Sequence, residues 1–279
     1  MTAIGRSAGS LPSGAAPSEI SWLSGIARVF EYRLLDYRRT YRSSIFNSFV
    51  GPALFLAAMG VGLGTYVNDS AALGGVSYLA FLAPGLLAAT AMQTASFEST
   101  FPIMGGLVWN RVYHAMYATP LRPSDIALGN LAWIAFRVLL VSTVFVLVTA
   151  LFGAAASPLI VFAIPVGVLT GLAFAGPIAA FSATQRNVNT FNAVFRFGIT
   201  PMFLFSGTFF PIDQLPAFLQ AVAWLTPLYH GVALSRGLSL GYAADEPLLM
   251  ALHAAVLVAF AAIGAYAATV TFRRKLVRG

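Results

Sequence analysis

Long apolar runs separated by short polar segments dominate this 279-residue chain. Most of the runs approach or exceed the roughly 20 residues that an α-helix needs to cross a lipid bilayer. The pattern predicts an all-α integral membrane protein with about six transmembrane helices. The predicted spans lie at about residues 45–67, 78–97, 126–152, 158–183, 194–205 and 247–272.

The residues on either side of this transmembrane domain (45–272) have a different composition. Between Glu19 and Ser44, apolar residues recur at spacings of three and four, and charged residues fill much of the remainder. This pattern predicts an amphipathic helix (19–44) that lies in the headgroup plane as a simple anchor. The family resemblance described below implies that the same helix joins the chain to another subunit. Residues 1–18, rich in Gly, Ser, Ala and Pro, are expected to form a disordered cytoplasmic tail, and 273–279 a basic cytoplasmic tail.

The segment from Ser206 to Gly241 connects the fifth and sixth predicted spans, yet it is not polar. It is too apolar for a water-exposed loop. Pro211, Pro216 and Pro227 also interrupt it too often for a single spanning helix. We therefore predict an external re-entrant helical hairpin, in which two short helices enter the membrane from one face and return to it.

The distribution of basic residues predicts the orientation of the chain. Charged residues make up only 9% of the sequence, with a formal net charge of +7. Arginine and lysine cluster before the first span and after the second, fourth and sixth spans, whereas the opposite loops contain only Arg236. By the positive-inside rule both termini are cytoplasmic. This placement favours a membrane orientation signal over a nucleic-acid surface, so no nucleic-acid partner is expected.

The residues that usually carry catalysis or bind cofactors are sparse. Cysteine is absent, and Lys275, the single lysine, follows no glycine-rich turn, so the chain has no phosphate-binding loop. His114, His230 and His253 fall in three different segments without accompanying carboxylate pairs, and we interpret each as a lone structural histidine. We predict no catalytic site, no metal site and no cofactor bound by this chain.

Arg137 is the most conspicuous charge within a predicted span. An ionised side chain in hydrocarbon costs several kcal/mol, so such residues are functional candidates. In one interpretation the span begins later and Arg137 reaches the cytoplasmic headgroups. In the other, Arg137 pairs with a buried polar group or an anionic substrate.

Three stretches carry a resemblance to a known family: YLAFLAPGLLAATAMQTASFEST (Tyr78 to Thr100), TPLRPSDIALGN (Thr119 to Asn130) and SGTFFPIDQLP from Ser206. Over about residues 44–241 the chain resembles ABC-2 type permeases. The resemblance is strongest to the NodJ group and extends more distantly to DrrB-type drug-exporter permeases. The resemblance implies a bacterial plasma-membrane exporter that moves a lipid-like, amphipathic, glycolipid or drug substrate out of the cytoplasm or the inner leaflet.

The same resemblance implies the partners. A separate ABC ATPase subunit, in two copies, would bind ATP and Mg²⁺, and the permease would pair with a second copy or with a homologous permease, surrounded by membrane lipids. It also suggests that the segment from Leu107 to Ala118 forms a coupling helix that contacts the ATPase, although a plain surface helix would have the same pattern. The residues assigned to coupling are Trp109, Asn110, Arg111, Tyr113, His114 and Tyr117.

The resemblance further places a substrate route between two permeases, along the second and fifth spans. The residues assigned to this route are Gln93, Thr94, Asn192, Thr200, Phe203 and Phe205. Phe209, Phe210 and Pro211 would lie at an external gate.

Two other classes of protein fit the sequence less well. A secondary transporter or channel driven by an ion gradient would place acidic residues at the midplane of its spans and would often contain an internal repeat. We find no Asp or Glu well inside a predicted span and no convincing repeat. A membrane-embedded enzyme acting on lipids would need histidine and carboxylate clusters at one membrane face, and the pattern contains none.

Overall fold

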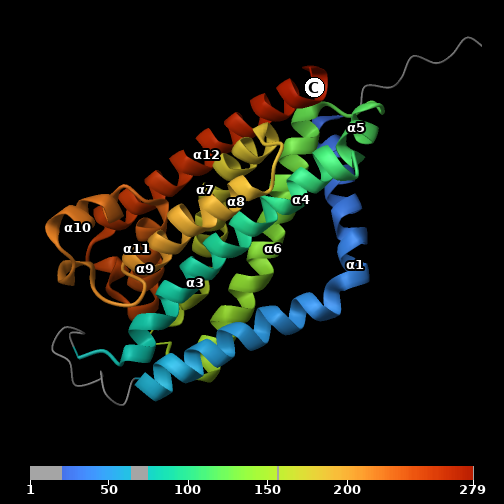
Figure 1. Cartoon of the computed structure of the whole chain (residues 1–279). Coiled ribbons are helices and arrows are strands. Elements are labelled where there is room, and N and C mark those ends of the chain that lie inside the picture. Colours follow the sequence, from blue (N-terminus) through green and yellow to red (C-terminus); the bar gives the residue numbers. More distant parts are fainter. Residues whose placement is uncertain (1–20, 64–74, 156, 279) are drawn as a thin grey trace, which may run out of the picture.

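The computed structural model describes residues 21–63, 75–155 and 157–278. Within these ranges the chain forms helices joined by loops and no strand, which confirms the all-α prediction. Figure 1 shows long helices lying side by side, with α10 and α11 at one end of the molecule and α5 and the C-terminus at the other. The predicted tail, residues 1–18, lies outside the described residues.

The helices follow one another along the chain in this order: α1 (Trp22–Phe55), the π-helix η1 (Leu56–Leu63), α3 (Tyr78–Glu98), α4 (Phe101–Met104), the π-helix η3 (Gly105–Trp109), α5 (Val112–Tyr117), α6 (Pro123–Leu151), the 3₁₀-helix η4 (Pro158–Phe162), α7 (Ala163–Thr184), α8 (Asn189–Val194), the π-helix η5 (Phe195–Ile199), α9 (Thr200–Phe205), the 3₁₀-helix η6 (Ile212–Gln214), α10 (Ala217–Trp224), α11 (Pro227–Leu240), the 3₁₀-helix η7 (Tyr242–Ala244) and α12 (Pro247–Arg278).

Four helical runs in the described part of the chain are long and apolar enough to cross a membrane: Tyr78–Trp109, Pro123–Leu151, Pro158–Thr184 and Pro247–Arg278. They contain the second, third, fourth and sixth predicted spans. The first predicted span, 45–67, lies partly outside the described residues, and the fifth lies within the shorter run Asn189–Phe205. The total of six spans therefore stays a prediction.

Helix α1 has no break at Ser44, where the amphipathic segment was predicted to give way to the first span, although its ribbon changes direction (Figure 1). The basic segment from Arg273 is helical to Arg278, as the last turns of α12. Helix α3 ends at Glu98, close to the predicted end of the second span, and after a break at Ser99 and Thr100 the helical run continues to Trp109.

The segment between the fifth and sixth predicted spans forms two short helices, α10 and α11, that meet at 86°. Thr226 and Pro227 explain where α11 begins. The Thr226 hydroxyl accepts a hydrogen bond from the Tyr229 N–H, and Pro227 occupies the first helical position, which needs no N–H donor. The two predicted helices are therefore present, whereas their re-entry into the membrane stays a prediction.

Glycines allow the helices to approach closely, as is common in membrane bundles. At the crossing of α7 and α12, a Cβ atom on Gly176 would lie 2.5 Å from the Gly264 carbonyl carbon. A Cβ on Gly264 would lie 2.7 Å from the backbone nitrogen of Pro177. Because the neighbouring atoms are backbone, no side-chain rotation can make room, and both positions require glycine.

Candidate functional site

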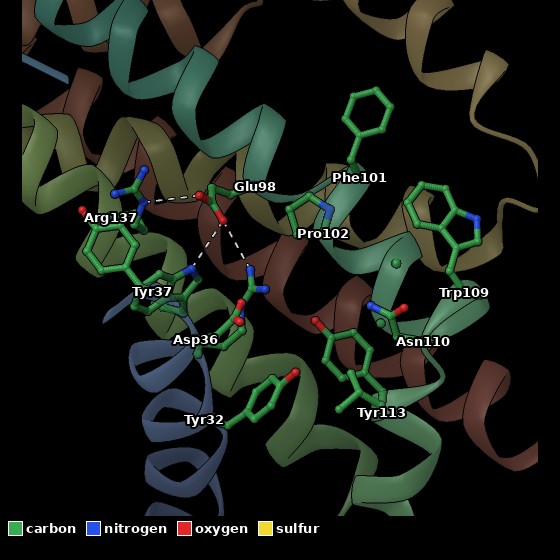
Figure 2. A pocket seen from close by; sticks show the side chains of 15 residues that line it. Tyr32, Asp36, Tyr37, Glu98, Phe101, Pro102, Trp109, Asn110, Tyr113 and Arg137 are labelled. Carbon is green, nitrogen blue, oxygen red and sulfur yellow. Dashed lines mark hydrogen bonds and ion pairs between the residues drawn. The ribbon is translucent and has the colours of Figure 1, made fainter. Parts of the chain in front are cut away.

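A cavity of about 370 Å³ lies at the end of the bundle that carries α5. Residues of α1, the end of α3, α4, η3, α5 and α6 line it (Figure 2). The lining includes three of the residues predicted to couple to the ATPase, Trp109, Asn110 and Tyr113, together with Arg137. This cavity, called the inner pocket below, therefore brings together two sets of residues that were predicted separately.

Glu98 is the centre of an ion cluster in the inner pocket. Its carboxylate accepts hydrogen bonds of 3.3 Å from Arg33 Nη2, Trp133 Nε1 and Arg137 Nε (Figure 2). The Arg33 and Arg137 side chains are each 12% exposed and that of Glu98 is 16% exposed. The Arg137 guanidinium also lies 4.6 Å from the centre of the Tyr37 ring. The cluster joins α1, α3 and α6 through charges that are largely removed from solvent.

These contacts bear on two of the predictions. Arg137 pairs with a largely buried carboxylate, in line with one of its two interpretations. Glu98 is the last residue of α3, at the predicted end of the second span, and lies within the longer helical run Tyr78–Trp109. The two arginines make that position tolerable, because an isolated carboxylate there would be strongly destabilising.

The predicted coupling helix, Leu107 to Ala118, is divided in two. Trp109 ends η3, Asn110 caps it, and Arg111 adopts left-handed backbone angles (φ 50°, ψ 23°) before α5 begins at Val112. Non-glycine residues seldom adopt this conformation, and where they do they often mark functional sites. The prediction of one continuous helix was wrong because the sequence has no glycine or proline between Leu107 and Ala118 to signal the break.

Tyr113 anchors α5 to the bundle. Its side chain is 1% exposed, and its hydroxyl donates a 2.7 Å hydrogen bond to Asn130 Oδ1 on α6. Asn130 Nδ2 in turn donates to the Ile126 carbonyl. Burial raises the pKa of the Tyr113 hydroxyl above its ordinary value, so the hydroxyl keeps its proton and remains a donor. Gly106 makes room for the ring, because a Cβ there would lie 2.4 Å from Tyr113 Cε2.

Replacing Tyr113 with phenylalanine should leave Asn130 Oδ1 buried without its donor. The expected cost is about 1–3 kcal/mol of folding free energy, the usual range for one unsatisfied buried polar atom. The midpoint of thermal unfolding in detergent measures this loss. Tyr117→Phe, which changes an exposed tyrosine on the same helix, is the matched control and should leave the midpoint unchanged. Equal midpoints for both variants would contradict the anchoring role.

The other predicted coupling residues are accessible to solvent. Trp109 is 58% exposed, Asn110, Arg111 and Tyr117 are also exposed, and His114 is partly exposed. Tryptophan and tyrosine contribute strongly to protein-binding surfaces. The segment therefore combines a buried tyrosine that holds it in place with an exposed tryptophan and tyrosine that are free to meet another protein.

The residues assigned to the substrate route lie on α3 and on the run from α8 to α9, outside the inner pocket. Gln93, Asn192, Thr200 and Phe205 are exposed and Thr94 is partly exposed. Phe203 instead packs against buried residues of the core. The polar members thus line the outside of this single chain, where a second copy or lipid would cover them.

The residues of the predicted external gate lie in the loop that follows α9. Phe209 contacts Phe203 and Phe55, with ring centres 5.0 and 6.1 Å apart. Phe210 and Pro211 are partly exposed beside it. The loop is therefore fixed to the end of α1 through aromatic packing.

The interpretation of His230 and His253 as lone histidines is wrong. The structure brings them together across α11 and α12, with their Nδ1 atoms 2.7 Å apart, and both side chains are buried. His230 Nε2 lies 2.9 Å from the Trp224 carbonyl, which can only accept, so this nitrogen carries the hydrogen. His253 Nδ1 then donates to His230 Nδ1. Sequence reasoning missed the pair because 23 residues and a loop separate its members.

A family model described as "ABC-2 type transporter" matches residues 26–240. The chain therefore belongs to the ABC-2 type transporter family, and with several membrane-spanning candidates it is a multi-pass membrane component of a transporter. The match begins within α1 rather than near residue 44, so it includes Arg33 of the ion cluster.

Relatives match almost the whole chain. Nodulation protein J of Rhizobium leguminosarum bv. viciae is 34% identical over 269 residues, which is 96% of this chain and 98% of that protein. Nodulation protein J of R. leguminosarum bv. trifolii is 32% identical over 274 residues, 98% of this chain and 99% of the relative. The protein of the same name from Bradyrhizobium diazoefficiens is 33% identical and covers 90% of this chain and 93% of its own length. The resemblance to the NodJ group is confirmed.

Proposed function

We propose that this chain is the permease subunit of an ATP-driven exporter. Two copies of an ABC ATPase subunit bind ATP and Mg²⁺ and dock on the segment Trp109–Tyr117. The permease pairs with a second copy, or with a homologous permease, in a bacterial plasma membrane, with both termini in the cytoplasm. It moves a lipid-like or amphipathic molecule outward. Relatives named nodulation protein J and the membership of the ABC-2 type transporter family support this proposal.

The observation that carries the coupling step is the pairing of an anchor with an exposed surface. Tyr113 is fixed to Asn130, while Trp109 and Tyr117, on either side of it in the sequence, are exposed. The inner pocket lies directly behind this segment, and its ion cluster joins three helices. A push on the exposed aromatic residues would therefore act on α1, α3 and α6 together.

Glu98 bears on the alternative of an ion-gradient-driven transporter, which requires an acidic residue inside a span. Its carboxylate is already occupied by Arg33, Arg137 and the Trp133 indole. A carboxylate held between two guanidinium groups is suited to joining helices rather than to binding a passing cation. The exporter is therefore the function that we propose.

The proposal is tested by co-purification of the tagged chain from native membranes in mild detergent, followed by mass spectrometry and an ATPase assay. We expect a stoichiometric ATPase subunit. The double change Trp109→Ala and Tyr117→Ala should reduce its recovery at least about tenfold, because truncating a central Trp or Tyr commonly costs about 2 kcal/mol or more at an interface.

The matched control is Tyr266→Ala, which removes an aromatic side chain that is 73% exposed on α12 and does not belong to the segment Trp109–Tyr117. It should leave recovery of the ATPase unchanged. If no nucleotide-binding subunit is recovered with the unmodified chain in several detergents, the ATP-driven mechanism is wrong. If the subunit is recovered equally with both variants, the ATPase docks elsewhere.

A further inference from the structure

A second cavity, of about 230 Å³, lies at the end of the molecule opposite α5. It is formed where the start of α3, the loop after α9, η6, α11 and η7 come together. Phe81, Asp213, Tyr229, Arg236 and Tyr242 are among its lining residues, and we call it the Arg236 pocket. Except for Pro211, none of its lining residues was assigned a role by sequence reasoning.

Arg236 is held firmly but its charge is not neutralised. Its Nε donates to the Phe81 carbonyl at 3.3 Å and its Nη2 donates to the Gly207 carbonyl at 2.8 Å. The guanidinium carbon lies 3.7 Å from the centre of the Phe81 ring. Among the described residues, no carboxylate forms an ion pair with Arg236. A guanidinium has five N–H donors, so these carbonyls leave donors free and a full positive charge in place.

The position of Arg236 is unusual for this chain. Arginine and lysine are otherwise confined to the segments on the opposite side of the predicted spans. Gly85 on α3 helps to accommodate the guanidinium, because a Cβ there would lie 3.2 Å from Arg236 Nη2 and 2.9 Å from the Thr208 carbonyl oxygen. A cation retained inside a preformed cavity, against the charge bias of the chain, indicates a site for an anionic group.

The rest of the lining narrows the chemistry of the ligand. Asp213 is exposed and contributes a negative charge to the same cavity. Tyr229 and Tyr242 add aromatic rings, and such rings attract ammonium groups. A ligand that carries only a negative charge would be attracted by Arg236 and repelled by Asp213. A ligand with a phosphate beside an ammonium would satisfy both charges.

We propose that the Arg236 pocket binds the headgroup of a zwitterionic phospholipid of the phosphatidylethanolamine kind. The phosphate meets Arg236, and the ammonium meets Asp213 and the tyrosines. The size of the cavity suits a headgroup and leaves the acyl chains outside, against the apolar surface of the helices. This lipid site is separate from the coupling segment and does not depend on the ATPase.

Native mass spectrometry of the delipidated full-length chain in detergent tests this site. The probes are dihexanoyl-phosphatidylethanolamine, dihexanoyl-phosphatidylglycerol and free phosphorylethanolamine. We expect the chain to bind the ethanolamine lipid more tightly than the glycerol lipid. Arg236→Gln should weaken that binding at least about tenfold, the usual effect of losing a hydrogen-bonded charge. The control is Arg278→Gln, which changes an arginine at the other end of the molecule, beside α5, and should bind the lipids as the unmodified protein does.

The variant Asp213→Asn distinguishes a loss of lipid recognition from a loss of folding, because it leaves both Arg236 hydrogen bonds in place. It should reduce the preference for the ethanolamine lipid over the glycerol lipid. An unchanged preference in Asp213→Asn, or unchanged affinity in Arg236→Gln, would overturn the proposal. If free phosphorylethanolamine binds as tightly as the lipid does, the pocket recognises a phosphate beside an ammonium, but the proposal that its occupant is a membrane lipid is wrong. ATPase recovery should be normal in Asp213→Asn, so the two proposals fail independently.

Discussion

Replacing Gly176 with valine should prevent α7 and α12 from packing as they do. A side chain at this position meets the backbone of Gly264 and Ala265, at 2.5 and 2.7 Å from its Cβ. Neither backbone can move without displacing a whole helix, so the cost should exceed the about 1–3 kcal/mol typical of overpacking in a core. We expect most of the protein to aggregate or elute as a broad peak in size-exclusion chromatography in detergent.

The matched control is Gly51→Val on α1, where an added Cβ meets no atom within 4 Å. This variant should elute as a sharp peak like the unmodified chain. Equal elution and equal thermal unfolding for both valine variants would show that the close approach of α7 and α12 is not needed for folding.

Removing the carboxylate of Glu98 should have the second large effect. Glu98→Ala leaves Arg33 and Arg137 as two like charges in a pocket with little exposure to solvent. Breaking a fully buried ion pair costs about 3–5 kcal/mol, and the partial exposure of this cluster lowers the expected cost to roughly 2–3 kcal/mol. Thermal unfolding measures the loss of stability, and the coupled ATPase assay measures the loss of function.

Two comparisons make this result specific. Asp36→Asn removes an exposed carboxylate from the lining of the same pocket and should have little effect. The double change Glu98→Ala with Arg137→Met removes one of the two uncompensated charges. It should therefore cost less than the sum of the two single changes. Strict additivity would contradict a direct interaction between Glu98 and Arg137.

The long helices were predictable because the length of an apolar run indicates whether it can form a helix that crosses a membrane. Four apolar runs became helices long enough to cross a membrane, and the proline-rich segment became the bent pair α10 and α11. Boundaries were less predictable. The composition changes near Ser44, but nothing there stops a helix, so α1 continues. At Arg111 the chain turns without glycine or proline, because tertiary packing of Tyr113 and Gly106 sets the backbone.

The candidate site could be predicted only in part, because its contacts join distant parts of the chain. Trp109, Tyr113 and Arg137 were identified as candidates, but the partner of Arg137 was not. Glu98 is 39 residues from Arg137 and 65 from Arg33. One signal was present and overlooked. Arg33 with Tyr37, and Trp133 with Arg137, are spaced four apart, so each pair shares one face of its helix. A helix face that carries an arginine beside an aromatic ring can pack against a second face of the same kind through cation–π contacts, so this spacing suggests that α1 and α6 are neighbours.

One helix, α1, reaches both ends of the molecule, although its ribbon bends between them (Figure 1). Arg33, in its first part, belongs to the ion cluster beside the predicted coupling segment, and Phe55, its last residue, contacts Phe209 of the predicted gate. A single stretch of backbone therefore joins the cytoplasmic and external sites that the sequence predicts, in addition to the side-chain packing of the bundle.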